Sequence, residues 1–391
     1  MQLVATTMAL PALATFEDCA DFSKTVVPFI PQLYELPQQL LNSWSNPDEL
    51  LELYIATNPL ISAFALALAL FPIIWMVSEV NRNYSQVDRL WSILPAIFIG
   101  HFVAYGHLIG LDTERLDTLL ISVVIWSVRL TFNYWRRGGY SIGSEDYRWM
   151  IVKKKVDTWS PVIWPLFNII FIAGMQLTLL LLISAPAYIQ LLVTNMGMGI
   201  SKVDTLFPRA LVGLVMIEAL ADHQQWSLFP HFVLDDVDTN IYLQDFQSAK
   251  AKYRATAKVP QGYEQEDLDR GFVVSGLFSL CRHPNFACEQ AFWVALYQWS
   301  CFNTDHLYNW TGIGAFSLLC LFQGSTWLTE MLTAQKYPDY KEYQKRVSKF
   351  IPRMSHALPG DPDDEPTVEP VPKATTSGKK GDKGQKGSKR N

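Results

Sequence analysis

Seven stretches of the sequence, each about 18 to 22 residues long, are apolar enough to cross a lipid bilayer. A crossing helix needs about 20 predominantly apolar residues, because the hydrocarbon core is about 30 Å thick and a helix rises about 1.5 Å per residue. The stretches are 58–78, 90–110, 117–135, 162–184, 206–226, 285–302 and 310–330. The sequence therefore predicts an all-α fold, a polytopic membrane bundle of about seven transmembrane helices.

Composition agrees with this class of protein, and it divides the chain into three parts. Of 391 residues, 49% are hydrophobic, and 13 Trp and 22 Phe are present, which is typical of a multi-span membrane protein. Before the first stretch, Pro28, Pro31 and Pro37 are expected to interrupt any long helix. We expect a non-cytoplasmic or interfacial segment at 1–57, a transmembrane domain at 58–352, and a disordered, charged cytoplasmic tail at 353–391.

Lys and Arg gather in alternate loops between the apolar stretches. The loops after the third and fifth stretches hold six each, whereas the loop after the second holds only Arg115 and the loop after the sixth holds none. Cytoplasmic loops of membrane proteins carry an excess of these residues. The C-terminus is therefore predicted to be cytoplasmic, and the N-terminus to lie on the other side.

The sixth stretch begins in a dense polar cluster, within the sequence GLFSLCRHPNFACEQAFW. Pro284 fixes its own φ and disfavours a helical conformation at His283, so the spacing predicts a turn that ends where a helix begins, at Pro284. Asn285 and Glu289 then lie on one face of that helix. Polar groups that enter a membrane are costly unless they meet partners or a ligand. We therefore interpret Arg282, His283, Asn285 and Glu289 as candidate binding residues.

A structural interpretation of these residues stays open. Arg282 and His283 could mark the cytoplasmic membrane edge, and Asn285 and Glu289 could bond to neighbouring helices. The same choice applies to Asp88, which is either a helix cap stabilised by the helix dipole or a proton donor at the mouth of a cavity.

Two further charged positions lie within apolar stretches. Arg129 lies six residues before the end of the third stretch, where an arginine needs a counter-charge or an anionic ligand. Glu218 and Asp222 are four residues apart near the end of the fifth stretch, so both acids lie on one helical face. Neither His223 nor any of the five cysteines has the partner spacing of a metal site, and we expect no metal.

The loop RRGGYSIGSEDYRW follows the third stretch and combines glycines with Glu145, Asp146 and Arg148. It is either a lid that faces a ligand or an ion-paired cytoplasmic loop.

Several blocks together resemble the steroid 5-alpha-reductase-like integral membrane proteins, in their uncharacterised branch. The resemblance covers about residues 60 to 352 and is most specific in its RHPNF and KYPDY motifs. The blocks are DRLW (88–91), RLTFNYWRRGGY (129–140), EDYRW (145–149), ADHQQW (221–226), GLFSLCRHPNFACEQ (276–290) and KYPDYKEYQKRVSKFIP (336–352).

The resemblance implies a seven-helix bundle that is open to the cytoplasm and binds NADPH within the membrane of the endoplasmic reticulum. It implies a catalytic role for Asp88. For cofactor binding it implies Asn285, Phe286 and Glu289, with Asp222 and Arg129 at matching positions. Arg129 and Arg282 could also meet the cofactor's phosphates by charge-assisted bonds. The full set of candidate cofactor-binding residues is Arg129, Asp222, Arg282, His283, Asn285, Glu289 and Tyr337. The chain departs from the family where a catalytic tyrosine is expected, because Trp126 at that position cannot donate a phenolic proton.

Three functional hypotheses follow from this resemblance and these residues. The leading one is an NADPH-dependent reductase of a C=C bond in a lipophilic, steroid- or enone-like substrate. The second is an S-adenosylmethionine-dependent membrane methyltransferase of the isoprenylcysteine type, whose C-terminal half is similar. The third is a non-catalytic lipid-binding membrane protein, which Trp126 favours. The expected partners are a lipophilic small molecule and membrane lipids, and no nucleic acid.

Overall fold

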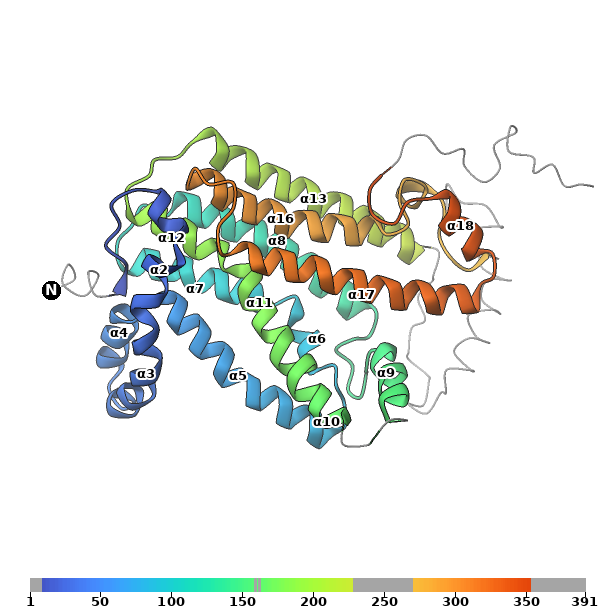
Figure 1. Ribbon diagram of the computed structural model, residues 1–391, viewed down its shortest axis with the longest axis horizontal. Coiled ribbons are helices and arrows are strands. Elements are labelled where there is room, and N and C mark those ends of the chain that lie inside the picture. Colours follow the sequence, from blue (N-terminus) through green and yellow to red (C-terminus); the bar gives the residue numbers. More distant parts are fainter. Residues whose placement is uncertain (1–8, 158–159, 161–162, 228–269, 353–391) are drawn as a thin grey trace, which may run out of the picture.

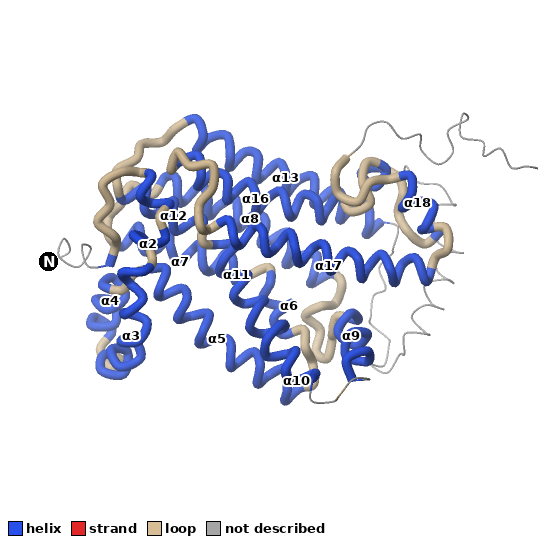
Figure 2. The backbone as a smooth tube through the Cα atoms, viewed as in Figure 1, coloured by secondary structure: helices blue, strands red, loops and turns tan. Residues whose placement is uncertain are grey.

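The computed structural model describes residues 9–157, 160, 163–227 and 270–352, which form helices joined by loops, with no strand among these residues (Figure 1 and Figure 2). The expected all-α fold is confirmed for this part of the chain. The tail predicted at 353–391 and residues 228–269 of the loop that precedes Pro284 lie outside the described residues.

Four segments of the described chain are helical, long and apolar enough to cross a membrane. They are Pro59–Asn81 (α5), Gln86–Leu108, Glu114–Arg136 (α8) and Ile163–Asn195. The second consists of α6 (Gln86–Trp91) and α7 (Leu94–Leu108). The fourth consists of α10 (Ile163–Phe167), the π-helical segment η3 (Asn168–Met175), α11 (Gln176–Ser184) and α12 (Pro186–Asn195). By length and composition, the protein has the character of a multi-pass membrane protein.

The remaining three apolar stretches also form long helices, but these are not among the four. They are α13 (Lys202–Ser227), α16 (Pro284–Asn303) and α17 (Gly312–Lys336). α13 and α16 carry acidic and amide side chains, Glu218 and Asn285 among them, and both helices are less apolar than α5. The number of seven spans therefore stays a prediction.

Short helices make up the segment before α5. They are η1 (Glu17–Ala20), α2 (Phe22–Thr25), η2 (Val27–Phe29), α3 (Ile30–Ser43) and α4 (Pro47–Ala56). Pro28 and Pro31 lie in the first turns of η2 and α3, where the missing N–H has no helical partner to lose. Pro37 lies inside α3, so the expectation that it interrupts a helix is wrong. The packing of α3 against α4 and α5 holds that helix together despite the lost hydrogen bond.

Local sequence sets where the long helices begin and how closely they approach. The side chain of Asn58 accepts a hydrogen bond of 2.9 Å from the backbone N–H of Leu60, which caps α5. α16 begins at Pro284, as predicted, and His283 before it has a non-helical backbone (φ −135°, ψ 66°). A Cβ at Gly314 would collide with the backbone of Leu182, so a glycine is needed where α17 packs against α11.

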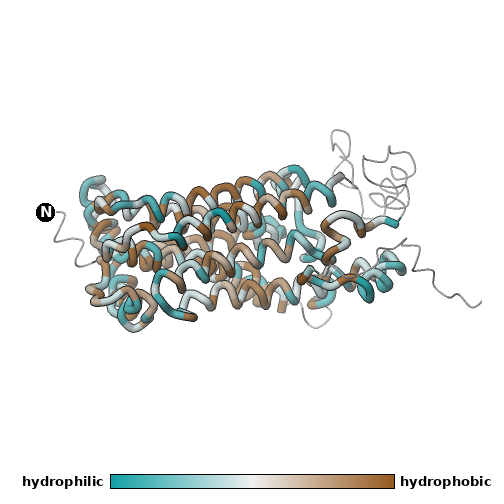
Figure 3. Tube along the Cα trace, turned by 90° about the horizontal axis from the view of Figure 1, so that it is seen from above, coloured by the Kyte–Doolittle hydropathy of each residue, from teal (hydrophilic) through white to brown (hydrophobic). Residues whose placement is uncertain are grey.

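The long helices lie side by side in one bundle. α13 packs along both α16 and α8, and α17 packs against α11 and α16 (Figure 1). Fully buried indoles of α8 and α16 lie between these helices, at Trp126, Trp293 and Trp299. Apolar residues gather in the middle of the bundle and polar residues toward its two ends (Figure 3).

The two ends of the bundle differ in the segments that they carry. One end, here called the α18 end, carries α9 (Tyr147–Asp157), η4 (Gly276–Ser279) and α18 (Tyr340–Arg346), and α16 begins there. The other, the N-terminal end, carries α2, α3 and α4 (Figure 1).

Candidate functional site

Helices α8, α13 and α16 bring together Arg129, Asp222, Asn285 and Glu289, four of the residues expected to bind a cofactor. Asn285 and Glu289 are one turn apart in α16 because Pro284 starts that helix just before them. Glu218, one turn before Asp222 in α13, joins them. These five residues are here called the Asp222 cluster.

The carboxylate of Asp222 accepts hydrogen bonds from three other side chains. Oδ2 lies 2.8 Å from Nε and 2.6 Å from Nη2 of Arg129, and it also accepts from Nδ2 of Asn133 at 2.5 Å. Oδ1 accepts from Nδ2 of Asn285 at 3.3 Å, the longest contact of the four. Asn285 is half-buried, whereas Asp222 is buried. The counter-charge that Arg129 was expected to need is therefore present.

Two indoles hold the carboxylate of Glu289. Nε1 of Trp126 donates to Oε2 at 2.8 Å, and Nε1 of Trp293 donates to Oε1 at 2.9 Å. Nη1 of Arg129 lies 3.5 Å from Oε2. Both Glu289 oxygens therefore accept N–H groups from fully buried rings, which fixes the side chain within the bundle.

Glu218 adds a third acid around the single Arg129 guanidinium. Its Oε1 lies 2.5 Å from Nη1 of Arg129, and the residue is only 1% exposed. Two like charges about 4 Å apart repel by about 4 kcal/mol at an effective dielectric constant of about 20. Three ionised carboxyls around one cation would leave excess negative charge in a buried place. The sequence placed Glu218 and Asp222 on one face of a helix but assigned no role to Glu218.

Arg136 lies at the edge of the Asp222 cluster, at the end of α8, and sequence reasoning counted it only as a loop charge. Its Nη2 donates to the backbone oxygen of Asp222 at 3.2 Å, and its guanidinium lies 4.6 Å from the ring centre of Trp226. Nε of Arg136 is buried and has no hydrogen-bond partner within residues 9–157, 160, 163–227 and 270–352. A buried donor without a partner is unusual and is suited to an anionic group.

Arg282 and His283 make no hydrogen bond to the Asp222 cluster in the described part of the chain. They contact Glu330 of α17 instead, where Nε of Arg282 lies 2.7 Å and Nε2 of His283 lies 2.9 Å from Oε1. Tyr340 and Gln344 of α18 donate to the same carboxylate, at 3.4 and 3.0 Å. These five residues, here called the Glu330 cluster, tie the start of α16 to the segment after α17.

The structure places the remaining two predicted site residues elsewhere. Tyr337 directly follows α17, and the centre of its ring lies 5.9 Å from that of Phe272. Asp88 lies in α6 and accepts a hydrogen bond of 2.7 Å from Nε1 of Trp149 in α9. Among the described residues, Asp88 makes no hydrogen bond to the Asp222 cluster, so its catalytic role stays a prediction without support from contacts.

The loop before α9 is ion-paired and tied to the bundle, which favours the second of its two interpretations. Arg148 bonds to Asp146 at 2.9 and 2.8 Å, and Glu145 accepts from the backbone N–H of Tyr84 at 2.6 Å. Burial raises the pKa of Glu145 above its usual value. Burial alone would also raise the pKa of Asp146, but Arg148 outweighs it and lowers that pKa.

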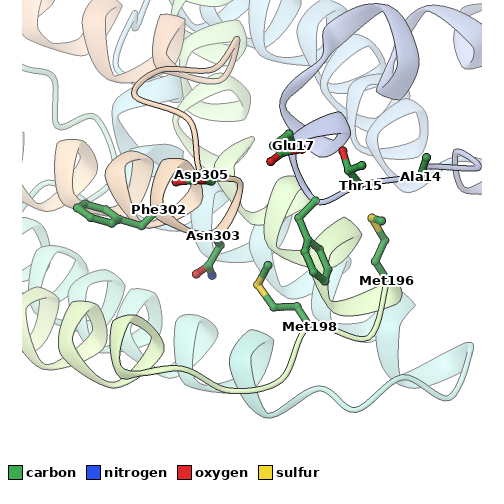
Figure 4. Close-up of a pocket in the computed structure, with 9 residues that line it drawn as sticks. Ala14, Thr15, Glu17, Met196, Met198, Phe302, Asn303 and Asp305 are labelled. Carbon is green, nitrogen blue, oxygen red and sulfur yellow. The ribbon is translucent and has the colours of Figure 1, made fainter.

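Two hollows lie at the N-terminal end, and no residue of the Asp222 cluster lines either of them. The larger, of about 660 Å³, is lined by Met196, Met198, Phe302 and Asn303 among others (Figure 4). The smaller, of about 240 Å³, adjoins the buried pair of Arg115 and Asp204, whose Nε and Oδ1 are 2.8 Å apart. The residues that the structure describes contain no group of three or more His, Cys, Asp or Glu side chains placed to hold a metal ion.

Comparison with known proteins identifies relatives but no activity. The model of a family described as a protein of unknown function (DUF1295) matches residues 74–347. An uncharacterized protein of Schizosaccharomyces pombe is 35% identical over 347 residues, which is 88% of this chain and 93% of the relative. No solved structure matches. Because the family model covers more than half of the sequence, the chain belongs to the DUF1295 family.

Proposed function

We propose that the protein is an NADPH-dependent reductase of a C=C bond in a lipophilic, steroid- or enone-like substrate. The observation that carries this proposal is the convergence of Arg129, Asp222, Asn285 and Glu289 from three helices, near the α18 end of the bundle. The resemblance to steroid 5-alpha-reductase-like proteins supplies the reaction class.

The residues present fit an anionic dinucleotide in two respects. Arg136 offers a buried Nε without a partner to a phosphate oxygen. Asn285 is half-buried and makes the longest contact to Asp222, so its amide can exchange that contact for the carboxamide of a nicotinamide ring. Asp222 and Glu289 lie deeper and hold Arg129 and the indoles in place.

The chemistry also needs a dry place for the reacting carbons. When bound, NADPH supplies the hydride. Trp126, Phe292 and Trp293 are fully buried beside Glu289, and their rings lie 4.9 to 6.1 Å apart. Aromatic side chains around a carboxylate exclude water and suit a flat apolar substrate.

A second candidate function is non-catalytic lipid binding, and one observation favours it. Trp126 stands where a catalytic tyrosine is expected from the resemblance to steroid 5-alpha-reductase-like proteins. Its Nε1 donates to Glu289 of the protein itself and not toward a substrate. In this case the chain would keep the fold and bind a lipid without reducing it.

A cofactor titration of the purified full chain separates these functions. Nicotinamide fluorescence and thermal unfolding would be followed with NADPH and, in parallel, with S-adenosylmethionine. A ligand at 100 times its Kd stabilises the folded state by about 2.7 kcal/mol. We expect NADPH alone to raise the unfolding temperature. A shift with S-adenosylmethionine alone would favour a methyltransferase, and a shift with neither, beside retained sterol binding, would favour the non-catalytic function.

We also propose that α13, α16 and α17 cross the membrane beside the other four segments, with the α18 end in the cytoplasm and the protein in the endoplasmic reticulum. The side-by-side packing of α13 with α16 and α8 supports this arrangement, and so does the alternation of Lys and Arg along the sequence. Cysteine labelling from either side of sealed microsomes, at single positions placed in each loop, tests it.

A further inference from the structure

Glu218 is a buried acid, and one of its carboxyl oxygens has no hydrogen-bond donor in the described part of the chain. Its Oε1 lies 2.5 Å from Nη1 of Arg129, whereas its Oε2 is buried and has no hydrogen-bond partner among the residues that the structure describes. An ionised carboxylate in this setting would leave a charged oxygen without a donor, which buried carboxylates avoid. A protonated carboxyl needs an acceptor at that oxygen instead of a donor.

The groups around Glu218 indicate which of the three neighbouring carboxyls carries a proton. They are Arg129 of α8, Asp222 of its own helix, and Cys288 and Glu289 of α16. Both oxygens of Asp222 accept N–H groups, and both oxygens of Glu289 accept indole N–H groups. Asp222 and Glu289 are therefore satisfied as carboxylates, whereas Glu218 is not.

Glu289 is placed to accept a hydrogen bond from a protonated Glu218. The two side chains meet at one atom, because Nη1 of Arg129 lies 2.5 Å from Oε1 of Glu218 and 3.5 Å from Oε2 of Glu289. Each oxygen of Glu289 has a second lone pair beyond the one that an indole uses. Two acids that share a site commonly hold one proton between them, because both cannot ionise cheaply at short range.

We propose that Glu218 and Glu289 form a buried proton-binding site, in which Glu218 carries the proton at neutral pH and donates a hydrogen bond to Glu289. With Glu218 neutral, Arg129 and Arg136 balance Asp222 and Glu289, so the site presents no excess negative charge to an anionic ligand.

The role of this proton in chemistry rests on the proposed function. Reduction of a C=C bond adds a hydride from NADPH to one carbon, and the π electron pair then forms a C–H bond with a proton at the other carbon. The O–H bond of Glu218 breaks as that bond forms, and Glu218 is left as a carboxylate that water reprotonates. The site thus supplies the proton that Trp126 cannot supply.

Infrared spectroscopy of the full chain in lipid tests the site without a substrate. At pH 7, held constant across samples, the wild type should show a carboxylic acid C=O band that Glu218→Gln removes. Glu218→Asp, which keeps the acid but moves it by one methylene, should shift the band. The matched control Glu35→Gln, at an exposed position of α3, should leave the band unchanged. A wild type without the band, or a folded Glu218→Gln variant that keeps it, would overturn the proposal.

The pH dependence of NADPH binding gives a second readout. Deprotonation of Glu218 adds a negative charge, so wild-type affinity for NADPH should fall by about tenfold or more as the pH is raised from about 6 to about 9. Glu218→Gln cannot ionise, so its affinity should fall less than half as steeply on a logarithmic scale. If the wild type binds no NADPH but Glu218→Gln still removes the band, the proposed function fails and the proton site stands. If NADPH binds and the two proteins share one pH profile, the proton site fails alone.

Discussion

Nε1 of Trp126 in α8 donates a hydrogen bond of 2.8 Å to Oε2 of Glu289 in α16. This contact joins two helices that meet across the interior of the bundle, and Trp293 donates to the other oxygen of the same carboxylate. An indole at this position cannot act as an acid, but it fixes a carboxylate firmly. The indole of Trp126 therefore has a structural role that can be measured.

Trp126→Phe should destabilise the protein. Phenylalanine preserves most of the apolar contact but removes the N–H, so Oε2 of Glu289 loses a donor in a buried place. Leaving a buried polar group short of a partner costs about 1 to 3 kcal/mol. Thermal unfolding of the full chain in detergent micelles measures the change. Trp135→Phe is the matched control, because Trp135 is in the same helix and is 62% exposed. Equal unfolding temperatures for the two variants would contradict the prediction.

Asn285→Ala should weaken NADPH binding without unfolding the protein. Asn285 is half-buried, and its side chain makes two contacts among the described residues: Nδ2 donates to Asp222 at 3.3 Å, and Oδ1 accepts from the backbone N–H of Phe286 at 3.0 Å. Loss of one hydrogen bond to the cofactor, worth about 1 kcal/mol, lowers the affinity by about fivefold. Fluorescence titration with NADPH measures the affinity.

Gln290→Ala is the control for Asn285→Ala. Gln290 lies in the same helix and bonds only to the backbone oxygen of Phe286, at 2.8 Å, among the described residues. Its removal should leave NADPH affinity unchanged. Glu289→Ala is a poorer test of binding, since it would leave the N–H groups of Trp126 and Trp293 buried without an acceptor. If Asn285→Ala binds NADPH as tightly as Gln290→Ala does, the cofactor does not contact this amide.

Arg136→Gln should lower NADPH affinity and reduce its dependence on salt. The buried Nε of Arg136 is suited to a phosphate oxygen, and charge-assisted hydrogen bonds are worth about 1.5 to 3 kcal/mol. An affinity loss of about tenfold or more is expected. Titrations with NADPH at two salt concentrations measure both effects. The neighbouring Arg137 is exposed, so Arg137→Gln serves as the control. Equal losses in the two variants would indicate a general effect of charge at this end of the bundle.

The local sequence pattern predicted where helices form. It also predicted features that are set within a single helix, such as its first residue and the side chains that share one face. The helix start at Pro284 follows from the backbone restriction that proline imposes on His283. The shared face of Asn285 and Glu289 follows from their spacing of four. The need of Arg129 for a counter-charge follows from its depth in an apolar stretch, and Asp222 meets that need.

Contacts between helices could not be predicted in the same way, because they depend on how each helix is rotated about its axis. Arg282 and His283 lie beside Asn285 in the sequence, yet they bond to Glu330, 48 and 47 residues away, in a separate cluster. The spacing of Arg282, His283 and Asn285 in the sequence does not indicate which of them bonds to Glu330 and which to Asp222. Glu218 and Arg136 were visible as charges, but only the packing of α8, α13 and α16 shows that each has a buried atom without a hydrogen-bond partner in the described structure.

The buried pair of Arg115 and Asp204 at the N-terminal end should make the protein sensitive to acid. Burial alone would raise the pKa of Asp204, but hydrogen bonds from Arg115, Asn303 and other donors hold it well below its usual range. Its folded pKa is therefore lower than the unfolded value of about 3.9. The stability that Asp204 contributes is then fully present above the unfolded pKa, and it is lost as the pH falls from about 5 toward the folded pKa.

Asp204→Asn should lower the free energy of unfolding at neutral pH by about 3 to 5 kcal/mol, because it leaves the Arg115 charge buried without a counter-charge. It should also remove part of the acid sensitivity, since asparagine does not titrate in this range. Unfolding of the full chain in micelles, followed from pH 7 down to about pH 3, measures both effects. Asp112→Asn, at an exposed loop position just before α8, is the control and should keep the wild-type pH profile. If wild type and Asp204→Asn lose stability in parallel as the pH falls, the acid sensitivity arises from other carboxylates, and the pair contributes only at neutral pH.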